Sequence, residues 1–317
     1  MIVAITGGTG FIGRVLAEKH IANGDTVRVL TRGGESALRT PDATQKHVGD
    51  LISCSVADLA PFVDGADVLY HCAGEIIEEG RMRALHVSGT EKLVEAATGR
   101  ISHWVQLSSV GVYGPVSEGV VTEKSPINPV GEYEVTKVES DKLVLDAANR
   151  GEFSCSVLRP SNVFGADMKN QALFNLMTMI DKGMFFFIGK AGASANYIHV
   201  DNVVEALMLC AKSPAARGKT YIISDHLPME RFIAIIATAF GRPVPRLRLP
   251  GLPARVLPSL LGWIPGFPLT ESRVKALTNR STYTSKRIRD ELDYHHLISL
   301  ERGLCELAEE WKRNGTA

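Results

Sequence analysis

The stretch Thr6-Gly7-Gly8-Thr9-Gly10-Phe11-Ile12-Gly13 directly follows a short apolar run, Ile2–Thr6, at the start of the chain. This is the order expected where a buried strand turns into a helix. Gly7 permits the tight turn, Gly10 lets the backbone approach a pyrophosphate, and Gly13 allows the helix to pack closely on the sheet. Because a helix N-terminus presents free N–H groups to an anion, the pattern predicts a dinucleotide site. The residues of this predicted turn are Gly7, Thr9, Gly10, Phe11, Ile12 and Gly13.

Short apolar runs alternate with amphipathic stretches over residues 1–160. Buried strands separated by helices of this length imply right-handed crossovers, and therefore a parallel, doubly wound α/β sheet of the Rossmann type. The predicted strands are Ile2–Thr6, Thr26–Thr31, Lys46–Val48, Val68–Cys72, Trp104–Ser108 and Cys155–Arg159. The predicted helices between them are Gly13–Ala22, Arg83–Ala97 and Glu132–Ala148.

The character of the sequence changes after Arg159, where prolines and glycines become frequent and helices such as Leu173–Lys182 and Val203–Lys212 are separated by irregular links. We expect residues 1–160 to form the dinucleotide-binding domain. The remainder, residues 161–317, is expected to be a smaller, mainly helical substrate lobe over the carboxyl ends of the strands. Segments of about 196–225 are expected to return to the first domain.

The segment 242–268 differs from its surroundings, because it is apolar and rich in proline and also carries arginines such as Arg246 and Arg248. We expect an extended segment that covers the lobe. A lid over an anionic substrate and a contact with a membrane surface are the alternatives.

The composition limits the classes of partner. Lysine plus arginine and aspartate plus glutamate number 35 each, so there is no global field that would attract nucleic acid. The five cysteines are scattered without CxxC spacing, which favours reduced thiols over a disulfide framework or a metal site. The chain begins with a strand-like run rather than a signal peptide, and it holds no apolar run of about 18 residues. We expect a cytoplasmic protein with a small-molecule substrate and no transmembrane segment.

The end of the second predicted strand decides between the two nicotinamide cofactors. Sites for NAD place an acidic residue about 20 residues beyond the glycine turn, to bind the ribose 2′-hydroxyl. Here Thr31 and Arg32 stand at that place. No carboxylate repels a 2′-phosphate, and the guanidinium of Arg32 is suited to bind one. NADP(H) is therefore favoured, and NAD(H) remains the alternative if Arg32 is only a solvated residue at the strand end.

Ser109, Tyr133 and Lys137 form a second group with a chemical meaning. A spacing of four places Tyr133 and Lys137 one helical turn apart on one face. A nearby ammonium and an oxidised nicotinamide ring would lower the pKa of the phenol from its usual value of about 10 toward the working pH, where a general acid/base is most effective. Ser109, at the end of the fifth strand, can bond to the reacting oxygen.

Together these features resemble the extended short-chain dehydrogenase/reductase family, also called the NAD-dependent epimerase/dehydratase family, and especially its members that modify nucleotide sugars. The likeness runs along nearly the whole chain. The stretches that carry it are TGGTGFIG (6–13), GDL (49–51), LYHCAG (69–74), HVSGT (86–90), SSVGVYG (108–114), YEVTK (133–137), LRPSNVFG (158–165) and YIHVDN (197–202).

The resemblance implies roles for individual residues. Ser109 would be the catalytic hydroxyl and Tyr133 the acid/base, while Lys137 would bind the nicotinamide ribose and lower the pKa of Tyr133. Implied cofactor contacts beyond the glycine turn are Thr31, Arg32, Asp50, Leu51, Cys72, Ala73, Gly74, Leu107, Ser108, Tyr133, Lys137, Pro160 and Ser161. Implied substrate contacts are Ser109, Val110, Tyr133, Asn162, Asn196 and Arg280. A homodimer built from the helices Arg83–Ala97 and Glu132–Ala148 is implied in the same way.

Two residues depart from the family pattern. His86 replaces the usual asparagine, so the bracing of the active-site helix is in doubt. Asn196 stands before Tyr197, where many nucleotide-sugar members carry an arginine for the diphosphate. If the substrate is a nucleotide sugar, another cation must serve, and Arg280 or the Arg246/Arg248 pair are the candidates.

The absence of certain residues narrows the range of reactions that the site can catalyse. Family dehydratases carry an Asp-Glu pair directly after the catalytic hydroxyl, and this chain has Val110 and Gly111 there. Hydride transfer at a single carbon remains. The preference for NADP(H) favours a reductase of nucleotide-linked 4-keto sugars over a nucleotide-sugar 4-epimerase. A 3β-hydroxysteroid-type dehydrogenase acting on a lipid-like alcohol and a non-enzymatic NADP-binding regulator are further alternatives.

Overall fold

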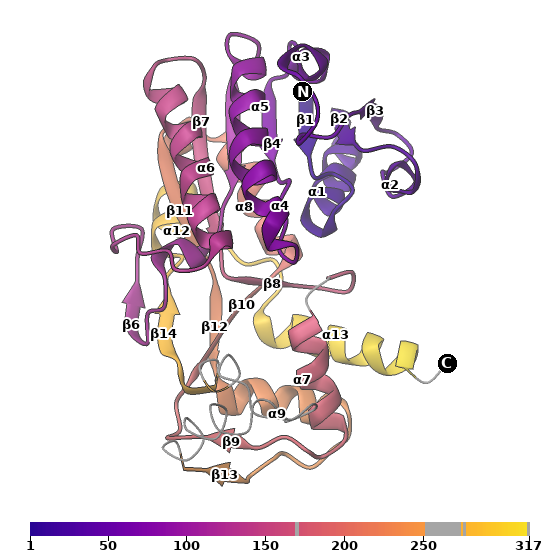
Figure 1. Cartoon of the computed structure of the whole chain (residues 1–317). Helices are drawn as coiled ribbons and strands as arrows, with labels where there is room; N and C mark the ends of the chain where they lie inside the picture. The colour runs from indigo at the N-terminus through magenta and orange to yellow at the C-terminus, as the bar shows by residue number, and fades with distance from the viewer. Residues whose placement is uncertain (169–170, 251–273, 275–276, 316–317) are drawn as a thin grey trace.

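Seven parallel strands form the central sheet of the computed structural model, which describes residues 1–168, 171–250, 274 and 277–315 (Figure 1). These strands are β1 (Ile2–Thr6), β2 (Thr26–Thr31), β3 (Gln45–Val48), β4 (Val68–His71), β5 (His103–Leu107), β7 (Ser154–Pro160) and β11 (Lys219–Ile223). They lie in the order β11-β7-β5-β4-β1-β2-β3. The chain reverses its direction of travel across the sheet between β1 and β4, and ligands bind at such a point in open α/β sheets.

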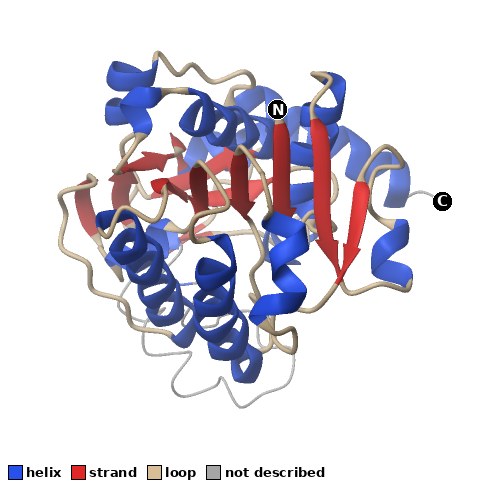
Figure 2. Ribbon diagram, turned by 90° about the horizontal axis from the view of Figure 1, so that it is seen from above, coloured by secondary structure: helices blue, strands red, loops and turns tan. Residues whose placement is uncertain are grey.

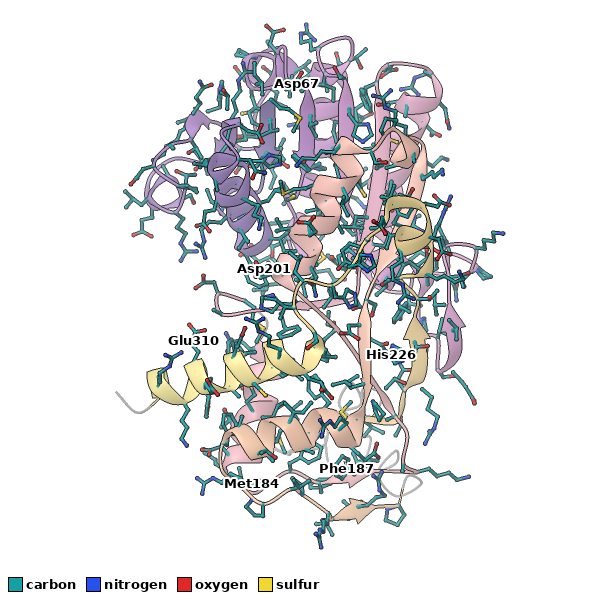
Figure 3. The ribbon with its side chains drawn as sticks, turned by 180° about the vertical axis from the view of Figure 1, so that it is seen from behind. Asp67, Met184, Phe187, Asp201, His226 and Glu310 are labelled. Carbon is teal, nitrogen blue, oxygen red and sulfur yellow. The ribbon has the colours of Figure 1, made fainter. Side chains whose placement is uncertain are left out.

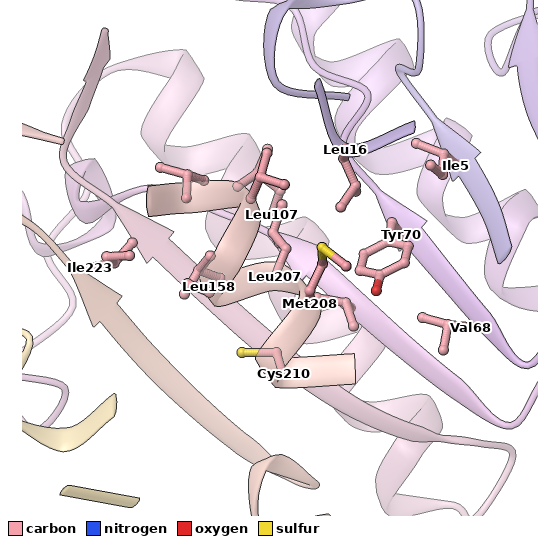
Figure 4. Close-up of a cluster of buried hydrophobic side chains, with 14 of the residues drawn as sticks. Ile5, Leu16, Val68, Tyr70, Leu107, Leu158, Leu207, Met208, Cys210 and Ile223 are labelled. Atoms are coloured by element: carbon pink, nitrogen blue, oxygen red, sulfur yellow. The ribbon is translucent and has the colours of Figure 1, made fainter. Parts of the chain in front are cut away.

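Helices cover both faces of this sheet, as Figure 2 shows. Alternate residues of a strand point to opposite faces, so Val3 and Ile5 of β1 face one layer and Ala4 the other. On the first face lie α1 (Phe11–Ala22), α8 (Val200–Lys212) and α12 (Lys286–Leu292). On the second face lie α3 (Val56–Val63), α5 (Gly89–Ala97) and α6 (Glu132–Asn149). Figure 4 shows Leu16 of α1 and Met208 of α8 close to Tyr70 of β4 in the core of the first face.

Short helical segments connect these elements. The stretch before α5 is continuous with it, because α4 (Glu79–Arg83) leads into the π-helical turn η1 (Ala84–Ser88) and then directly into α5. The others are α2 (Glu35–Leu38) and the 3-10 turns η2 (Val110–Tyr113) and η3 (Pro214–Ala216).

A second hydrophobic core lies beyond the carboxyl ends of the strands, in the lower part of Figure 1. Its helices are α7 (Gln171–Asp181), α9 (Met229–Ala239) and α13 (Leu300–Gly315). Three small sheets accompany them. They consist of β8 (Asn162–Phe164) with β10 (Ser194–His199) and β12 (Asp225–Pro228), of β9 (Phe187–Ile188) with β13 (Arg248–Leu249), and of β6 (Glu118–Val121) with β14 (Arg280–Tyr283).

The fold class expected from the sequence is confirmed, and each predicted strand corresponds to a strand of the central sheet. The helix α3 and the three small sheets were not predicted. Within 196–225, α8 and β11 do pack with the central sheet, but β10 belongs to a small sheet instead. The division at residue 160 stays a prediction. The part of the candidate lid (242–268) from position 251 onward lies outside the described residues. No helix in the described ranges is long and apolar enough to cross a bilayer.

Candidate active site

A cavity of about 720 Å³ opens along the carboxyl ends of β1, β2, β4, β5 and β7. It is lined by every residue that the sequence assigned to the cofactor, together with Ser109 and Asn162. These assigned cofactor residues are Gly7, Thr9, Gly10, Phe11, Ile12, Gly13, Thr31, Arg32, Asp50, Leu51, Cys72, Ala73, Gly74, Leu107, Ser108, Tyr133, Lys137, Pro160 and Ser161. Their gathering at one edge follows from the parallel sheet, in which all the carboxyl ends point the same way.

The glycine turn leaves no room for side chains. Gly7 has a φ of +70°, and a Cβ there would lie 2.7 Å from the backbone of Cys72 and Ala73. A Cβ on Gly13 would lie 2.3 Å from the carbonyl oxygen of Gly7. Gly10 is the N-cap residue of α1, and no side chain caps the N-terminal N–H groups of this helix. The geometry therefore fits a pyrophosphate at the start of α1.

Two arginines line the cavity where β2 ends. Arg32 follows the strand directly, and the short helix α2 brings Arg39 and Ser36 to the same cavity. Both guanidinium groups are exposed, and neither makes an ion pair or a side-chain hydrogen bond with a described residue. Glu35 is a carboxylate in the same lining. Arg39 and Ser36 were not predicted from the sequence, because no fixed spacing from the glycine turn marks residues that a separate short helix returns to the site.

Tyr133, Lys137 and Ser109 meet at the inner part of the cavity. Tyr133 and Lys137 lie on the first turns of α6, and Tyr133 shares a hydrogen bond with the Ser109 side chain. The Ser109 oxygen also accepts the N–H of Gly111 at 3.1 Å. The ammonium of Lys137 is buried and donates to the carbonyl oxygen of Leu107 at 2.5 Å.

The pKa of Tyr133 is displaced in the opposite direction from the one expected. Burial raises this pKa to about 12, the hydrogen bond with Ser109 opposes the rise, and the negative charges of Glu134 and Asp141 add to it. Lys137 is not among the groups that shift the Tyr133 pKa, and burial lowers its own pKa. In this geometry the cost of burying a phenolate dominates. The acidification expected from Lys137 together with a bound, oxidised nicotinamide ring stays a prediction. At neutral pH Tyr133 is a protonated phenol.

A buried ionic network lies behind these groups. The Asp141 carboxylate, on α6, accepts hydrogen bonds from the Ser108 hydroxyl at 2.7 Å and from the Arg159 guanidinium at 3.1 Å. Arg159 also donates to the Tyr113 hydroxyl at 3.0 Å. The network holds the end of β5 against β7 and α6, where Ser108 lines the cavity. This network could not be predicted from the sequence, because its members come from four separate parts of the chain.

Three of the residues assigned to the substrate do not line the cavity. Val110 packs in a small hydrophobic cluster on η2. Asn196 is buried, and its side-chain amide donates to the backbone carbonyl of Ser281 at 2.9 Å, while its backbone carbonyl accepts from the side-chain amide of Asn162. Arg280 donates to backbone carbonyls at 190 and 191. The expectation that Arg280 replaces the missing arginine is therefore not supported, because backbone carbonyls already engage its guanidinium.

The other candidate cations are also placed elsewhere. Arg248 pairs with Glu230 at 2.7 Å and lies 4.7 Å over the ring of Phe187. Phe187 lies deep in the lobe, far from the sheet, as Figure 3 shows. Arg246 is absent from the cavity lining as well, so none of the cations named from the sequence for the diphosphate lines the cavity. The described guanidinium groups in the lining are those of Arg32, Arg39 and Arg81.

An apolar rim at the mouth of the cavity is a further feature that was not predicted from the sequence. Ile76 and Ile77, in the loop after β4, line the cavity although they are 56% and 73% exposed. Leu85 of η1 lines the cavity too. Large exposed apolar side chains at the mouth of a cavity are typical of sites for apolar ligands.

Comparison with known proteins agrees with this geometry. Residues 3–224 match the NAD dependent epimerase/dehydratase family. The chain is 28% identical over 320 residues to the 4-hydroxy-2-methyl-3-oxo-4-farnesyl-3,4-dihydroquinoline-1-oxide ketoreductase of Stigmatella aurantiaca, covering 96% of this chain and 94% of that protein. It is 34% identical over 182 residues to the dTDP-6-deoxy-L-talose 4-dehydrogenase (NAD(P)(+)) of Kitasatospora kifunensis, covering 55% of this chain and 56% of that protein.

Among solved structures, the chain superimposes on the UDP-glucose 4-epimerase of Thermotoga maritima with a TM-score of 0.77 and 18% identity, and all of both chains is covered. This likeness concerns the fold. The match to the family spans more than two thirds of the sequence, from the first strand to the end of β11. The chain therefore belongs to the NAD-dependent epimerase/dehydratase family of extended short-chain dehydrogenases/reductases and is an NAD(P)-dependent enzyme.

Proposed function

We propose that the chain reduces a ketone to a carbinol at a single carbon with NADPH. The observation that carries this proposal is the buried phenol of Tyr133, which is protonated at neutral pH and bonded to Ser109 inside the cavity. A protonated phenol is the form that can give its proton to a carbonyl oxygen as that oxygen gains negative charge.

Each residue of this site then has one task. Tyr133 donates the proton, and Ser109 orients the substrate oxygen by a hydrogen bond. Lys137, held by the carbonyl of Leu107, presents a positive charge beside the ribose position. NADPH, when bound, supplies the hydride. Ser161 has a buried hydroxyl without a partner among the described residues, and it lines the cavity beside Pro160. Such an unpaired hydroxyl fits a polar ligand at that place.

The choice of NADPH over NADH rests on the two unpaired guanidinium groups of Arg32 and Arg39. A 2′-phosphate would satisfy both, whereas a 2′-hydroxyl would satisfy neither. Binding of 2′,5′-ADP and of 5′-AMP, measured by calorimetry, tests this without any substrate. We expect Arg39→Ala to weaken 2′,5′-ADP at least tenfold, the scale of one charge-assisted hydrogen bond, and to leave 5′-AMP unchanged. Equal affinity of the wild type for both probes would contradict the choice of NADPH.

Two classes of ketone have support. A nucleotide-linked 4-keto sugar is supported by the talose dehydrogenase relative and by Asn162 in the cavity lining. A neutral, lipophilic ketone is supported by the rim of Ile76 and Ile77 and by the placement of Arg280 outside the cavity. The relative named as a ketoreductase of a farnesyl-bearing quinoline also matches over nearly the whole chain. We favour the lipophilic ketone.

Oxidation of NADPH, followed at 340 nm, separates the two classes. One arm uses dTDP-4-keto-6-deoxyglucose and the other uses a 3-ketosteroid and a farnesyl-bearing ketone. We expect turnover only in the second arm, and turnover with the nucleotide sugar would restore the first class. A 4-epimerase would differ from both, because it would be purified with tightly held NAD and would interconvert sugar epimers without net NADPH oxidation.

A further inference from the structure

A buried histidine connects the loop after β4 with the helix of Tyr133. His86 is 1% exposed and lies in the middle of the π-helical turn η1. Its Nε2 accepts the backbone N–H of Glu75 at 2.8 Å, and its Nδ1 lies 2.8 Å from the hydroxyl of Thr136. The imidazole thus bonds to a different element through each of its nitrogens.

The backbone N–H of Glu75 fixes the direction of both hydrogen bonds of the His86 imidazole. A backbone N–H can only donate, so Nε2 must carry the lone pair. A neutral imidazole then carries its proton on Nδ1 and donates it to Thr136. The Thr136 hydroxyl in turn donates to the carbonyl oxygens of Glu132 at 2.7 Å and of Tyr133 at 3.1 Å. Burial lowers the pKa of His86 to about 4, so the neutral form is present at neutral pH.

The helix end of this chain of bonds lies at the catalytic phenol. The His86 ring packs edge-on against the Tyr133 ring, with centroids 5.8 Å apart and an interplanar angle of 78°. The bonds from Thr136 hold the first turn of α6, on which Tyr133 lies. A shift of this imidazole would therefore move both the backbone and the ring of Tyr133.

At its other end, this chain of hydrogen bonds reaches the loop after β4, which lines the cavity. The Glu75 carboxylate accepts the N–H groups of Ile76, Ile77 and Glu78 at 2.8–3.2 Å, which folds the loop into a compact turn. The segment from Cys72 to Ile77 lines the cavity. Because His86 holds the N–H at the start of this turn, it fixes how far the loop stands from the bound cofactor.

We propose that His86 is a positioning residue that couples the cofactor-facing loop at residues 72–77 to the helix of Tyr133. The proposal rests on the proposed function only in taking the cavity as the NADPH site. The π-helical turn contributes to this coupling, because the extra residue that it adds to the helix sets the direction of the His86 imidazole. Such turns occur often at functional sites. An asparagine at this position would be too short to reach both partners.

Three substitutions separate the two bonds. His86→Gln places an amide oxygen near the position of Nε2 and keeps the acceptor for Glu75. His86→Asn keeps a donor near Nδ1 for Thr136 and loses the acceptor. His86→Ala loses both. His103→Gln is the matched control, because His103 is another buried histidine that bonds Ser154 and Ser156 and does not line the cavity.

Two measurements on the folded chain test the coupling. NADPH dissociation constants are taken from nicotinamide fluorescence, and exchange of the Glu75 amide is followed by hydrogen–deuterium exchange in the chain without cofactor. We expect His86→Ala and His86→Asn to bind NADPH at least tenfold more weakly and to exchange the Glu75 amide faster, whereas His86→Gln stays within about threefold of wild type in both. The control should change neither.

Equal behaviour of the glutamine and alanine variants would overturn the proposal, and so would a Glu75 amide that exchanges at the wild-type rate in His86→Ala. A purely structural role for His86 would lower the melting temperature of all three variants without separating them in NADPH affinity. If the wild type failed to bind NADPH, the proposed function would fall, while the amide exchange would still decide whether the bond to Glu75 holds the loop. If the alanine variant did not fold, the comparison of glutamine with asparagine would decide the question.

Discussion

At the scale of single residues, the protonation of Tyr133 sets the direction of the chemistry. Its pKa is raised by burial to about 12, so its proton is available to a substrate at any ordinary pH. A group that acts as an acid loses activity only as the pH rises through its pKa. We therefore expect kcat for ketone reduction to be flat from pH 6 to pH 9 on the basic side of the profile. Alcohol oxidation, which needs the phenolate, should rise over the same range.

The predicted pH profile is checked by one control variant, and one result would contradict it. Tyr133→Phe should keep NADPH affinity and lose at least a hundredfold in rate, the usual scale for a general acid. Loss of reduction between pH 7 and pH 8 in the wild type would show that Lys137 does acidify the phenol in the working enzyme. That outcome would return the mechanism to the one expected from the sequence.

The buried pair of Asp141 and Arg159 gives a prediction of stability. Their side chains are 3% and 6% exposed, and removal of one partner leaves the other as an uncompensated buried charge. We expect Asp141→Ala to lower the free energy of unfolding by about 3–5 kcal/mol, measured by urea denaturation. The matched control is Arg302→Met, which breaks the ion pair between Arg302 and Glu306. The side chains of this pair are 67% and 47% exposed. Arg302→Met should change stability by less than about 1 kcal/mol. A similar cost for both variants would show that burial of the pair is not the cause.

At the scale of elements, the glycine turn, the strands of the central sheet and the spacing of Tyr133 and Lys137 could be predicted from the sequence, because each depends on residues close together in the chain. The features that could not be predicted depend on contacts between distant segments. Arg39 reaches the cavity only because α2 folds back, and Arg280 is taken by carbonyls of residues 190 and 191. The pKa of Tyr133 also depends on burial, which no local spacing reveals.

The first helix gives a prediction with an internal control. A Cβ on Gly13 of α1 would lie 2.3 Å from the Gly7 carbonyl oxygen, so Gly13→Ala must push the helix away from the turn. We expect a loss of about 1–3 kcal/mol in unfolding free energy and at least a tenfold loss in NADPH affinity. Gly80 of α4 has nothing within 4 Å of its Cβ position. Gly80→Ala should therefore stabilise the chain by about 0.4–1 kcal/mol, and equal destabilisation of both variants would refute the packing argument.

At the scale of the whole molecule, four histidines that are buried in the described part of the chain link stability to pH, and one of them is His20, whose pKa is lowered by burial. Burial lowers the pKa of His71 to about 3 and those of His86 and His103 to about 4. His71 and His103 lie in β4 and β5, and His86 lies in η1. All three must stay neutral in the folded chain, whereas in the unfolded chain they take up protons near pH 6.5. Their contribution to stability is therefore complete above pH 6.5 and is lost as the pH falls toward 4.

The size of this loss can be measured in a window that isolates the histidines. Between pH 6 and pH 5 most carboxylates keep their charge, so the three protons that His71, His86 and His103 take up on unfolding should lower the unfolding free energy by about 3–4 kcal/mol, and His20 adds to this loss. Urea denaturation at several pH values gives this slope directly. His103→Gln, which does not line the cavity, should reduce the slope by about 1 kcal/mol per pH unit, because one proton fewer is bound on unfolding. A stability that does not change over this window would mean that the three imidazoles are solvated enough to be protonated in the folded chain, and the neutral His86 on which the coupling of loop and helix depends would then be lost.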